Sequence, residues 1–250
     1  MAVILIGIDD TDNETSPGTG KLARRLAEEL TSIGATTLGL TRHQFLVDDR
    51  IPYTSHNSGA CVAVEWSGAI NEMRIAMELI GEWAAEGSDP GVCIAASDTV
   101  PDAVCEWGWR ATREVLTMDE AVSVARAGGL QLRALGGTGQ GIIGALASVG
   151  LRADGNEGRF LDLPGLRELG EYVTAAEVTK LGIELDHRIP DGNQNQDPPR
   201  VRGDGNLAIY RTMGWVRPRL VQGKAVWPVE WSEEHHEWIS VDQKRSRPLE

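Results

Sequence analysis

Residues 2–12 read AVILIGIDDTD, an apolar run that ends abruptly in three aspartates. An unbroken apolar run of seven residues, closed by acidic side chains, is typical of a strand buried on both faces. The polar stretch 12–20 then predicts a loop, and leucines spaced four residues apart from Leu22 to Leu30 predict a helix that Gly34 ends. The segment therefore predicts strand, loop and helix, the opening of an α/β fold.

The same alternation continues along the chain. Apolar runs predict strands at 36–47, 61–66, 92–96 and 130–135, and helical periodicity predicts helices at 69–85, 119–127 and 142–149. The strand, helix and strand between 61 and 96 form a predicted β-α-β unit. The stretch 186–206, rich in Asp, Asn, Gln, Pro and Gly, predicts a linker or long loop, and the remainder to 229 is predicted to be β-rich.

Composition narrows the class of protein. A length of 250 residues suggests one or two domains, and 37 acidic against 24 basic residues give a formal net charge of -13. Such a charge argues against a surface built for duplex DNA, bulk RNA or an anionic membrane. No apolar run approaches the ~18 residues of a membrane span, and residues 2–8 lack the cationic start of a signal peptide, so we expect a cytoplasmic protein. Cys61, Cys93 and Cys105 form no CxxC pair, which argues against a zinc ribbon and against a disulfide framework.

Asp9, Asp10 and Asp12 form the sharpest chemical signal. They place three carboxylates in four residues at the carboxyl end of a predicted strand, the edge at which open α/β sheets bind ligands. Clustered carboxylates repel one another unless a cation lies among them, and Mg²⁺ prefers one or two carboxylates together with substrate phosphates. The pattern predicts a Mg-nucleotide site, with an acidic turn that only caps and shapes the loop as the alternative.

Two glycine-rich helix starts accompany this acidic cluster. The first, Gly18, Thr19, Gly20 and Lys21, offers backbone N–H groups and a lysine to a phosphate, although Thr15 and Leu22 exclude a Walker A motif. The second includes Gly137, Thr138, Gly139, Gln140 and Gly141. Its G-x-G-x-x-G string lacks an identifiable acidic partner for a ribose, so a Rossmann assignment is not justified. Together the two loops predict a bound Mg-triphosphate, with ordinary helix-entry turns as the alternative.

A polar stretch before the strand at 61–66 supplies the candidate substrate contacts, His56, Asn57 and Ser58. A histidine here is suited to donate to a phosphate or to act as an acid or base. An exposed loop histidine is the alternative.

These residues resemble one family, the archaeal tRNA-isoleucine 2-agmatinylcytidine synthetases, whose members attach agmatine to a wobble cytidine with ATP. The resemblance covers roughly residues 1–155. The motifs that carry it, in the family's order, are residues 7–12, Ile51-Pro52-Tyr53 with Gly59-Ala60, Pro90-Gly91 and residues 139–150.

The resemblance implies a kinase-like α/β domain whose aspartates bind Mg²⁺ and ATP, interleaved with a ferredoxin-like domain that holds the amine in the family. If the two glycine loops converge on one triphosphate, the kinase-like domain comprises 1–58 and 130–185, and the ferredoxin-like domain comprises 59–129 and 190–250. The chain length and the scattered cysteines lead us to expect neither the OB-fold nor the zinc ribbon with which full-length members grip tRNA.

This chain also departs from the family. It carries Thr54, His56 and Gln140 where the family is basic. We therefore predict a Mg-ATP-dependent phosphotransferase or ligase-like enzyme that acts on a small molecule such as an amine, without stable direct tRNA binding. Two alternatives stay open: a non-catalytic nucleotide- or polyamine-binding protein, and a tRNA-modifying enzyme that needs a separate RNA-binding partner. Assembly into a homo-oligomer is also left open.

Overall fold

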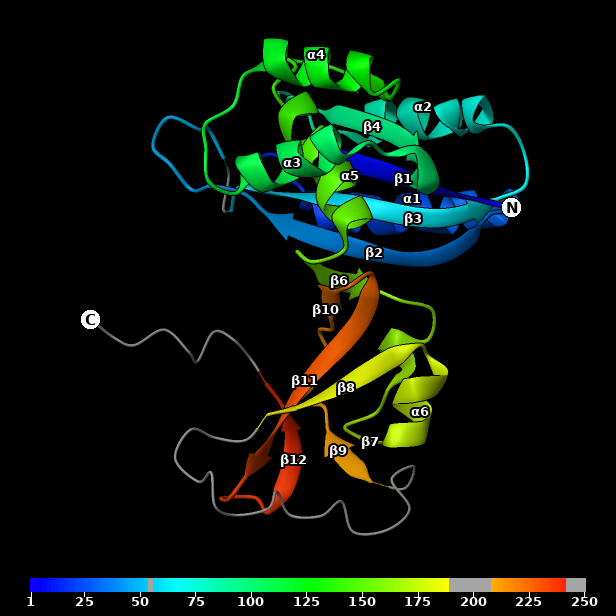
Figure 1. Ribbon diagram of the computed structural model, residues 1–250, viewed down its shortest axis with the longest axis vertical. Helices are drawn as coiled ribbons and strands as arrows, with labels where there is room; N and C mark the ends of the chain where they lie inside the picture. Colours follow the sequence, from blue (N-terminus) through cyan, green and yellow to red (C-terminus); the bar gives the residue numbers. More distant parts are fainter. Residues whose placement is uncertain (54–55, 189–207, 242–250) are drawn as a thin grey trace. The chain divides into compact units, whose positions relative to one another are not determined.

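The computed structural model describes residues 1–53, 56–188 and 208–241 (Figure 1). It divides the chain into two compact units, unit 1 at Met1–Leu163 and unit 2 at Pro164–Glu250. Both units combine helices and strands, so the predicted mixed α/β class is confirmed. Most of the predicted linker, and Thr54, lie outside the described residues. No helix in the described part of the chain has the length and apolar content that a bilayer span requires.

Unit 1 is built on an antiparallel sheet in the order β5-β4-β1-β3-β2-β6. Its elements in chain order are β1 Ala2–Asp9, α1 Thr19–Ser32, β2 Thr36–Gln44, β3 Ser58–Trp66, α2 Arg74–Trp83, β4 Gly91–Ala96, α3 Asp102–Ala111, α4 Met118–Ala127, β5 Gln131–Ala134, α5 Ile142–Asp154 and β6 Arg159–Asp162. Two short 3-10 turns, Ile70–Met73 and Ser97–Thr99, complete it.

Most of these elements match the predictions from the sequence. The predicted β-α-β unit is present in a split form, because β1 lies between β3 and β4 and runs antiparallel to both. Helix α3 was not predicted. Its buried residues Val104, Trp107, Gly108 and Ala111 do recur at helical spacing, and this was the signal available in the sequence.

The core of unit 1 has two layers, one on each face of the sheet. Along β1, Ile4, Ile6 and Ile8 pack against α1 and α2, whereas Leu5 faces the opposite layer with Trp107 of α3 and the buried side of α5. Alternation of side chains along a strand explains this division. Burial of β1 on both faces, as its apolar run predicted, fixes the strand at the centre of the unit.

The two compact units differ from the predicted pair of interleaved domains. We assigned 1–58 and 59–129 to separate domains, but β3 begins at Ser58 and lies between β1 and β2 in a single sheet. Strand pairing therefore binds the two predicted segments into one unit. The sequence did not reveal this because periodicity identifies strands but not their partners.

Unit 2 is β-rich, as predicted for the region up to 229. Its elements are the 3-10 turn η3 Leu166–Glu168, β7 Tyr172–Thr174, α6 Ala175–Lys180, β8 Ile183–Arg188, β9 Ile209–Arg211, β10 Arg219–Val221, β11 Lys224–Ser232 and β12 Glu237–Ser240. Strand β11 pairs antiparallel with β10 and β12 and parallel with β8. Trp227, Tyr210 and Trp238 form its aromatic core, and the ring of Tyr210 lies 6.1 Å from that of Trp227.

Helix α5 lies unusually close to the backbone of the sheet. A Cβ atom at Gly7 of β1 would overlap the carbonyl oxygen of Ala145, and one at Gly91 of β4 would overlap Gly141. Glycine is required at these positions because a side chain has no space there. The close approach places the first turn of α5 beside the end of β1.

We predict that Gly7→Ala destabilises the protein by about 1–3 kcal/mol, because the added methyl group meets backbone atoms that cannot move aside cheaply. Gly81→Ala is the matched control. Gly81 lies in α2, where an added Cβ makes only ordinary contacts at 3.9 and 4.0 Å to Leu135, and where alanine favours the helix. Urea denaturation measures both changes, and equal stabilities for the two variants would contradict the close-packing argument.

Candidate functional site

Strand pairing brings distant segments to one edge of the sheet in unit 1. Because β3 and β4 run antiparallel to β1, their first residues lie beside its end, with Ala60 opposite Ile8 and Gly91 opposite Asp9. The last residue of β2, Gln44, pairs with Ser58. The aspartate loop, the polar stretch 56–60 and the end of β2 therefore meet at this edge.

A cavity of about 250 Å³ lies at this edge. Three segments that the sequence singled out line it: the aspartates, the start of α1 and the polar stretch before β3. Its lining residues are Asp9, Asp10, Asp12, Gly18, Thr19, Gly20, Arg42, Pro52, Tyr53, His56, Asn57, Ser58, Gly59, Ala60 and Leu161.

Asp9 ends β1 with its carboxyl group against the first turn of α5. A Cβ atom at Gly144 would overlap an oxygen of this carboxyl, so the glycine makes room for it. Burial raises the pKa of Asp9 to about 8, with further contributions from the charges of Asp10 and Asp12. Asp9 is therefore a carboxyl group that the apo protein holds protonated near neutral pH.

Asp10 has a φ of 54°, in the left-handed region that few residues other than glycine adopt. Strain of this kind is common at functional sites. Burial, together with the charges of Asp89 and Asp12, raises the pKa of Asp10 to about 6, while the backbone N–H of Asp89 donates to its carboxylate and opposes the shift. Asp89 is thus a fourth member of the acidic cluster. The sequence reasoning missed it, although it directly precedes the Pro90-Gly91 motif.

Asp12 connects the loop to the start of α1. Its Oδ1 accepts hydrogen bonds from Thr19 Oγ1 at 2.7 Å and from the Thr19 backbone N–H at 3.3 Å. Thr11, which is buried, donates to Thr19 Oγ1 at 3.0 Å. Because Gly18 has no side chain to cap the helix, Asp12 provides the negative charge that a helix start favours. The alternative interpretation, a carboxylate that caps and shapes the turn, therefore applies in part to Asp12.

Arg42 is a cationic residue that lines the cavity, and the sequence reasoning missed it. It lies on β2, and its Nε donates to Ser58 Oγ at 2.9 Å. Along β2 the side chains alternate, so its neighbour His43 is fully buried and bonds to Thr41 and Glu157 instead. An arginine in the middle of a strand gives no motif, and only the register of β2 on β3 brings it to the cavity.

The three predicted substrate residues differ in their surroundings. His56 is exposed at the cavity wall, and Ser58 accepts the hydrogen bond from Arg42. Asn57 already forms hydrogen bonds to the chain that follows β2. Its Nδ2 donates to the Leu46 carbonyl at 2.7 Å, and its backbone carbonyl accepts from the Phe45 N–H at 2.9 Å. His56 and Ser58 are thus better placed than Asn57 to touch a ligand.

The predicted phosphate contacts separate into two groups. Gly18, Thr19 and Gly20 line the cavity, but Lys21 is exposed outside it, and Gly137, Thr138, Gly139, Gln140 and Gly141 are also absent from its lining. The second loop is anchored to Asp89 instead: the Thr138 N–H donates to its carboxylate, and the Gly141 N–H donates to its carbonyl at 3.0 Å. A Cβ atom at Gly141 would also lie only 2.9 Å from the carbonyl oxygen of Asp9, so this glycine serves close packing.

The acidic cluster suits a metal ion that a ligand helps to hold. Within residues 1–53, 56–188 and 208–241, no three Asp, Glu, His or Cys side chains are arranged to ligate a metal ion by themselves. Mg²⁺ does not need such a group, because it takes one or two carboxylates and completes its shell with phosphate oxygens and water. Burial and the neighbouring carboxylates raise the pKa values of Asp9 and Asp10, and a bound cation would offset both effects.

Comparison with known proteins gives one consistent set of relatives, although no family model matches the sequence. The isoleucine-tRNA 2-agmatinylcytidine synthetase TiaS of Pyrococcus horikoshii is 32% identical over 152 residues, which cover 58% of this chain and 35% of the relative. A solved complex of TiaS with an isoleucine tRNA and ATP matches with a TM-score of 0.53 and 27% identity, over 60% of this chain and 36% of that one. A TiaS complex with the same tRNA, AMPCPP and agmatine matches with a TM-score of 0.52 and 26% identity, again over 60% of this chain and 36% of that one.

This chain is related to TiaS. The resemblance inferred from the sequence motifs is thus confirmed by sequence and by fold. The match spans only about a third of the length of each TiaS relative, so it concerns one part of that enzyme.

The TiaS complexes also correct a prediction. We expected no stable direct binding of tRNA, but the related TiaS is solved with an isoleucine tRNA in both complexes, which contradicts that expectation. The expectation relied on the net charge of -13, on the expected lack of the OB-fold and zinc ribbon, and on Thr54, His56 and Gln140 at positions where the family is basic. Net charge is a sum over the whole chain, whereas RNA contacts depend on the local charge of one surface.

We predict that, without divalent cations, the free energy of unfolding falls as pH rises from about 4 to 8. In this window the unfolded aspartates have lost their protons, while Asp9 and Asp10 keep theirs up to about pH 8 and 6 in the folded state. Each such group contributes up to about -1.4 kcal/mol per pH unit. Asp9→Asn, which cannot ionise, should flatten the slope between pH 5 and 7 in urea denaturation.

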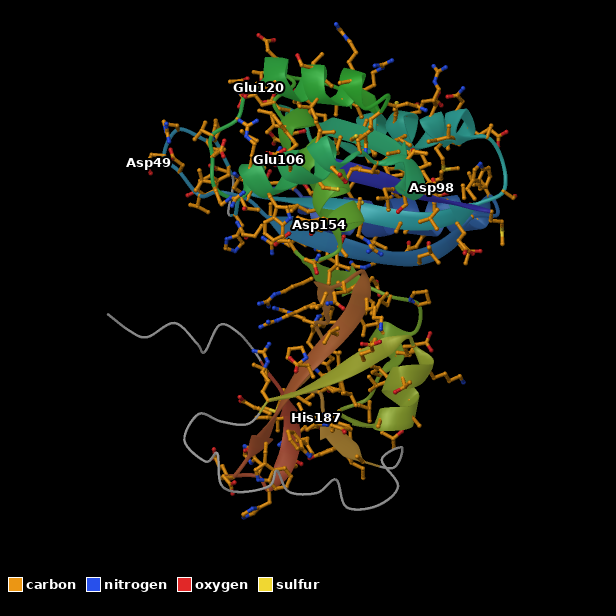
Figure 2. All side chains as sticks on the ribbon, in the orientation of Figure 1. Asp49, Asp98, Glu106, Glu120, Asp154 and His187 are labelled. Atoms are coloured by element: carbon orange, nitrogen blue, oxygen red, sulfur yellow. The ribbon has the colours of Figure 1, made fainter. Side chains whose placement is uncertain are left out.

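Asp98→Asn is the control for this measurement. Asp98 is an exposed carboxylate, labelled in Figure 2, and its neutralisation should leave the slope as in the wild type. If the slope of Asp9→Asn equals that of the wild type, Asp9 is not protonated in the folded protein.

Proposed function

We propose that this chain uses Mg-ATP in a ligase-type reaction on tRNA, with the nucleotide bound in the cavity at the end of β1. The observation that carries the proposal is the convergence of Asp9, Asp10 and Asp12 with the glycine start of α1 on one cavity. It is supported by the relation to TiaS, whose solved complexes contain ATP or AMPCPP. A small molecule as the only acceptor, which the sequence led us to predict, has no support in these relatives.

The residues of the cavity have distinct proposed tasks. Asp9 and Asp10 hold Mg²⁺ together with phosphate oxygens, and Asp12 orients the start of α1 while contributing charge. The backbone N–H groups of Gly18 and Gly20 face the phosphates at a helix start, where an anion is favoured. When bound, Mg²⁺ would neutralise phosphate charge and offset the repulsion within the aspartate cluster.

Arg42, His56 and Ser58 line the same cavity and supply further contacts to the ligand in this proposal. The guanidinium group of Arg42, oriented by Ser58, is suited to an anionic phosphate oxygen. His56, which lines the cavity, would contact the acceptor group of the reaction. Lys21 adds positive charge at the helix start from outside the cavity, and the loop 137–141 positions Asp89 and α5 without touching the nucleotide.

The fold also supports a proposal about the family's domain names. The elements β1-α1-β2-β3-α2-β4 with sheet order β4-β1-β3-β2 have the connections of a ferredoxin-like fold. We propose that the ferredoxin-like part is residues 2–96, in place of 59–129 with 190–250. The kinase-like character then belongs to unit 1 as a whole, since the aspartates and the cavity lie within it.

We predict that Mg-ATP stabilises the folded chain by ~2.7 kcal/mol at a hundredfold excess over its Kd. Asp10→Asn should remove most of this stabilisation, because asparagine tolerates the left-handed backbone but brings no charge for the metal. Thermal melts with ATP, Mg²⁺ and both together measure it, with Asp98→Asn as the control that keeps the shift. An unmoved midpoint at millimolar Mg-ATP in the wild type would refute nucleotide binding.

We further predict that ATP consumption depends on tRNA and on an amine such as agmatine. Arg42→Gln should lower the rate by about 10²–10³, the usual cost of losing one group that stabilises charge in a transition state. Arg42→Lys should recover part of it. Release of phosphate or pyrophosphate is the measurement. Nucleotide binding without consumption under any of these conditions would favour a non-catalytic binding protein.

A further inference from the structure

Unit 2 exposes a large aromatic side chain whose placement its own core does not explain. Trp227 and Trp238 are 1% and 5% exposed, whereas Trp215 is 43% exposed. Exposure of an indole leaves apolar surface in water, and tryptophan and arginine are enriched among the residues that carry the binding energy of interfaces.

The backbone around Trp215 is held rigidly. Its N–H donates to the Thr212 carbonyl at 3.2 Å, across a turn in which Met213 and Gly214 have φ values of 55° and 82°. Two successive positive φ values are typical of a type I′ turn, where asparagine or glycine is preferred and methionine is strained. Buried Thr212 anchors the turn, since its Oγ1 donates to the Gly170 carbonyl at 3.0 Å. These hydrogen bonds fix the backbone that carries the indole.

Two arginines flank the indole ring. The guanidinium carbon of Arg167, in η3, lies 4.6 Å from the ring centroid, and that of Arg217 lies 5.9 Å from it. Arg217 is exposed and forms no ion pair with any residue that the structure describes. The exposed part of the ring is thus bordered by positive charge.

The sequence around this site is basic although the chain is acidic. Residues 208–229 contain Arg211, Arg217, Arg219 and Lys224 and no acidic residue. Unit 2 as a whole holds 12 of the 24 basic residues of the chain and 14 of the 37 acidic ones, so its net charge is only -2. The excess negative charge of the chain is concentrated in unit 1.

We propose that Trp215, Arg167 and Arg217 form a stacking site for an unpaired base of RNA. The base stacks on the exposed part of the indole, and the guanidinium groups contact the flanking phosphates. An acidic peptide would use the arginines but has no group that needs a fixed aromatic plane, so the indole favours RNA. The inference rests on the proposed function in one respect, which is that tRNA supplies the unpaired base.

The test measures binding of fluorescein-labelled (rU)₁₂, of an abasic oligomer of the same length and charge, and of unmodified tRNA, by fluorescence anisotropy at about 150 mM salt. We expect (rU)₁₂ to bind at least about fivefold more tightly than the abasic oligomer. Trp215→Ala should weaken (rU)₁₂ and tRNA binding by about 5- to 100-fold and abolish the preference, since one stacked base is commonly worth that much. Trp215→Phe should keep part of it.

Charge is tested separately from stacking. Arg217→Gln should lower the slope of log Kd against log salt by about 0.7 for single strands, as expected for one lost phosphate contact. Arg126→Gln, an exposed arginine on α4 of unit 1, is the control for loss of one positive charge and should change neither affinity nor slope.

Three outcomes overturn the proposal: equal affinity for (rU)₁₂ and the abasic oligomer, Trp215→Ala binding within twofold of the wild type, or no RNA binding by the wild type. Thermal melts with Mg-ATP on the same variants separate these failures from failure of the proposed function. If Trp215→Ala binds tRNA like the wild type and keeps the Mg-ATP shift, only the stacking site is wrong. If the wild type binds neither RNA nor Mg-ATP, the proposed function fails with it.

Discussion

The close approach of α5 to the sheet determines where Asp9 and Asp89, two carboxyl groups at the end of β1, can lie. Gly7 and Gly91 remove the side chains that would hold the helix away, and Gly141 and Gly144 do the same on the helix side. The first turn of α5 then lies against Asp9 and Asp89. A helix at an ordinary distance would leave these carboxyl groups in water, where they would ionise as isolated aspartates do.

That packing disfavours the ionised forms of Asp9 and Asp10. Asp9 and Asp10 lose solvent and also face other carboxylates, so both effects raise their pKa values. Folding therefore holds these two carboxyl groups where ionisation is unfavourable. A divalent cation, bound together with a polyphosphate, would offset this unfavourable free energy. The left-handed backbone of Asp10 is a second unfavourable feature at the same place. Such strain persists where the surrounding structure, rather than local preference, decides the conformation.

Charge is unevenly divided between the two units, and this matters more than the total. Unit 1 gathers acidic side chains around a cavity that Arg42 also lines, whereas unit 2 places arginines beside an exposed indole. A metal-nucleotide site and an RNA-contacting surface make opposite demands on local charge, and separate units can meet both. One source of the error in our expectation about tRNA was to treat a net charge of -13 as if it were spread evenly over the chain.

The sequence by itself determined the elements and the chemistry that follows them. The apolar run at 2–8, the aspartates after it and the glycine start of α1 are local signals, and the cavity brings the aspartates together with Gly18, Thr19 and Gly20. Only the tertiary structure decided which strands pair, and with that the membership of Arg42 and Asp89 and the exclusion of the loop 137–141 from the cavity. The reason is physical: periodicity reports which face of an element is buried, but strand register and helix approach depend on contacts between residues far apart in the chain.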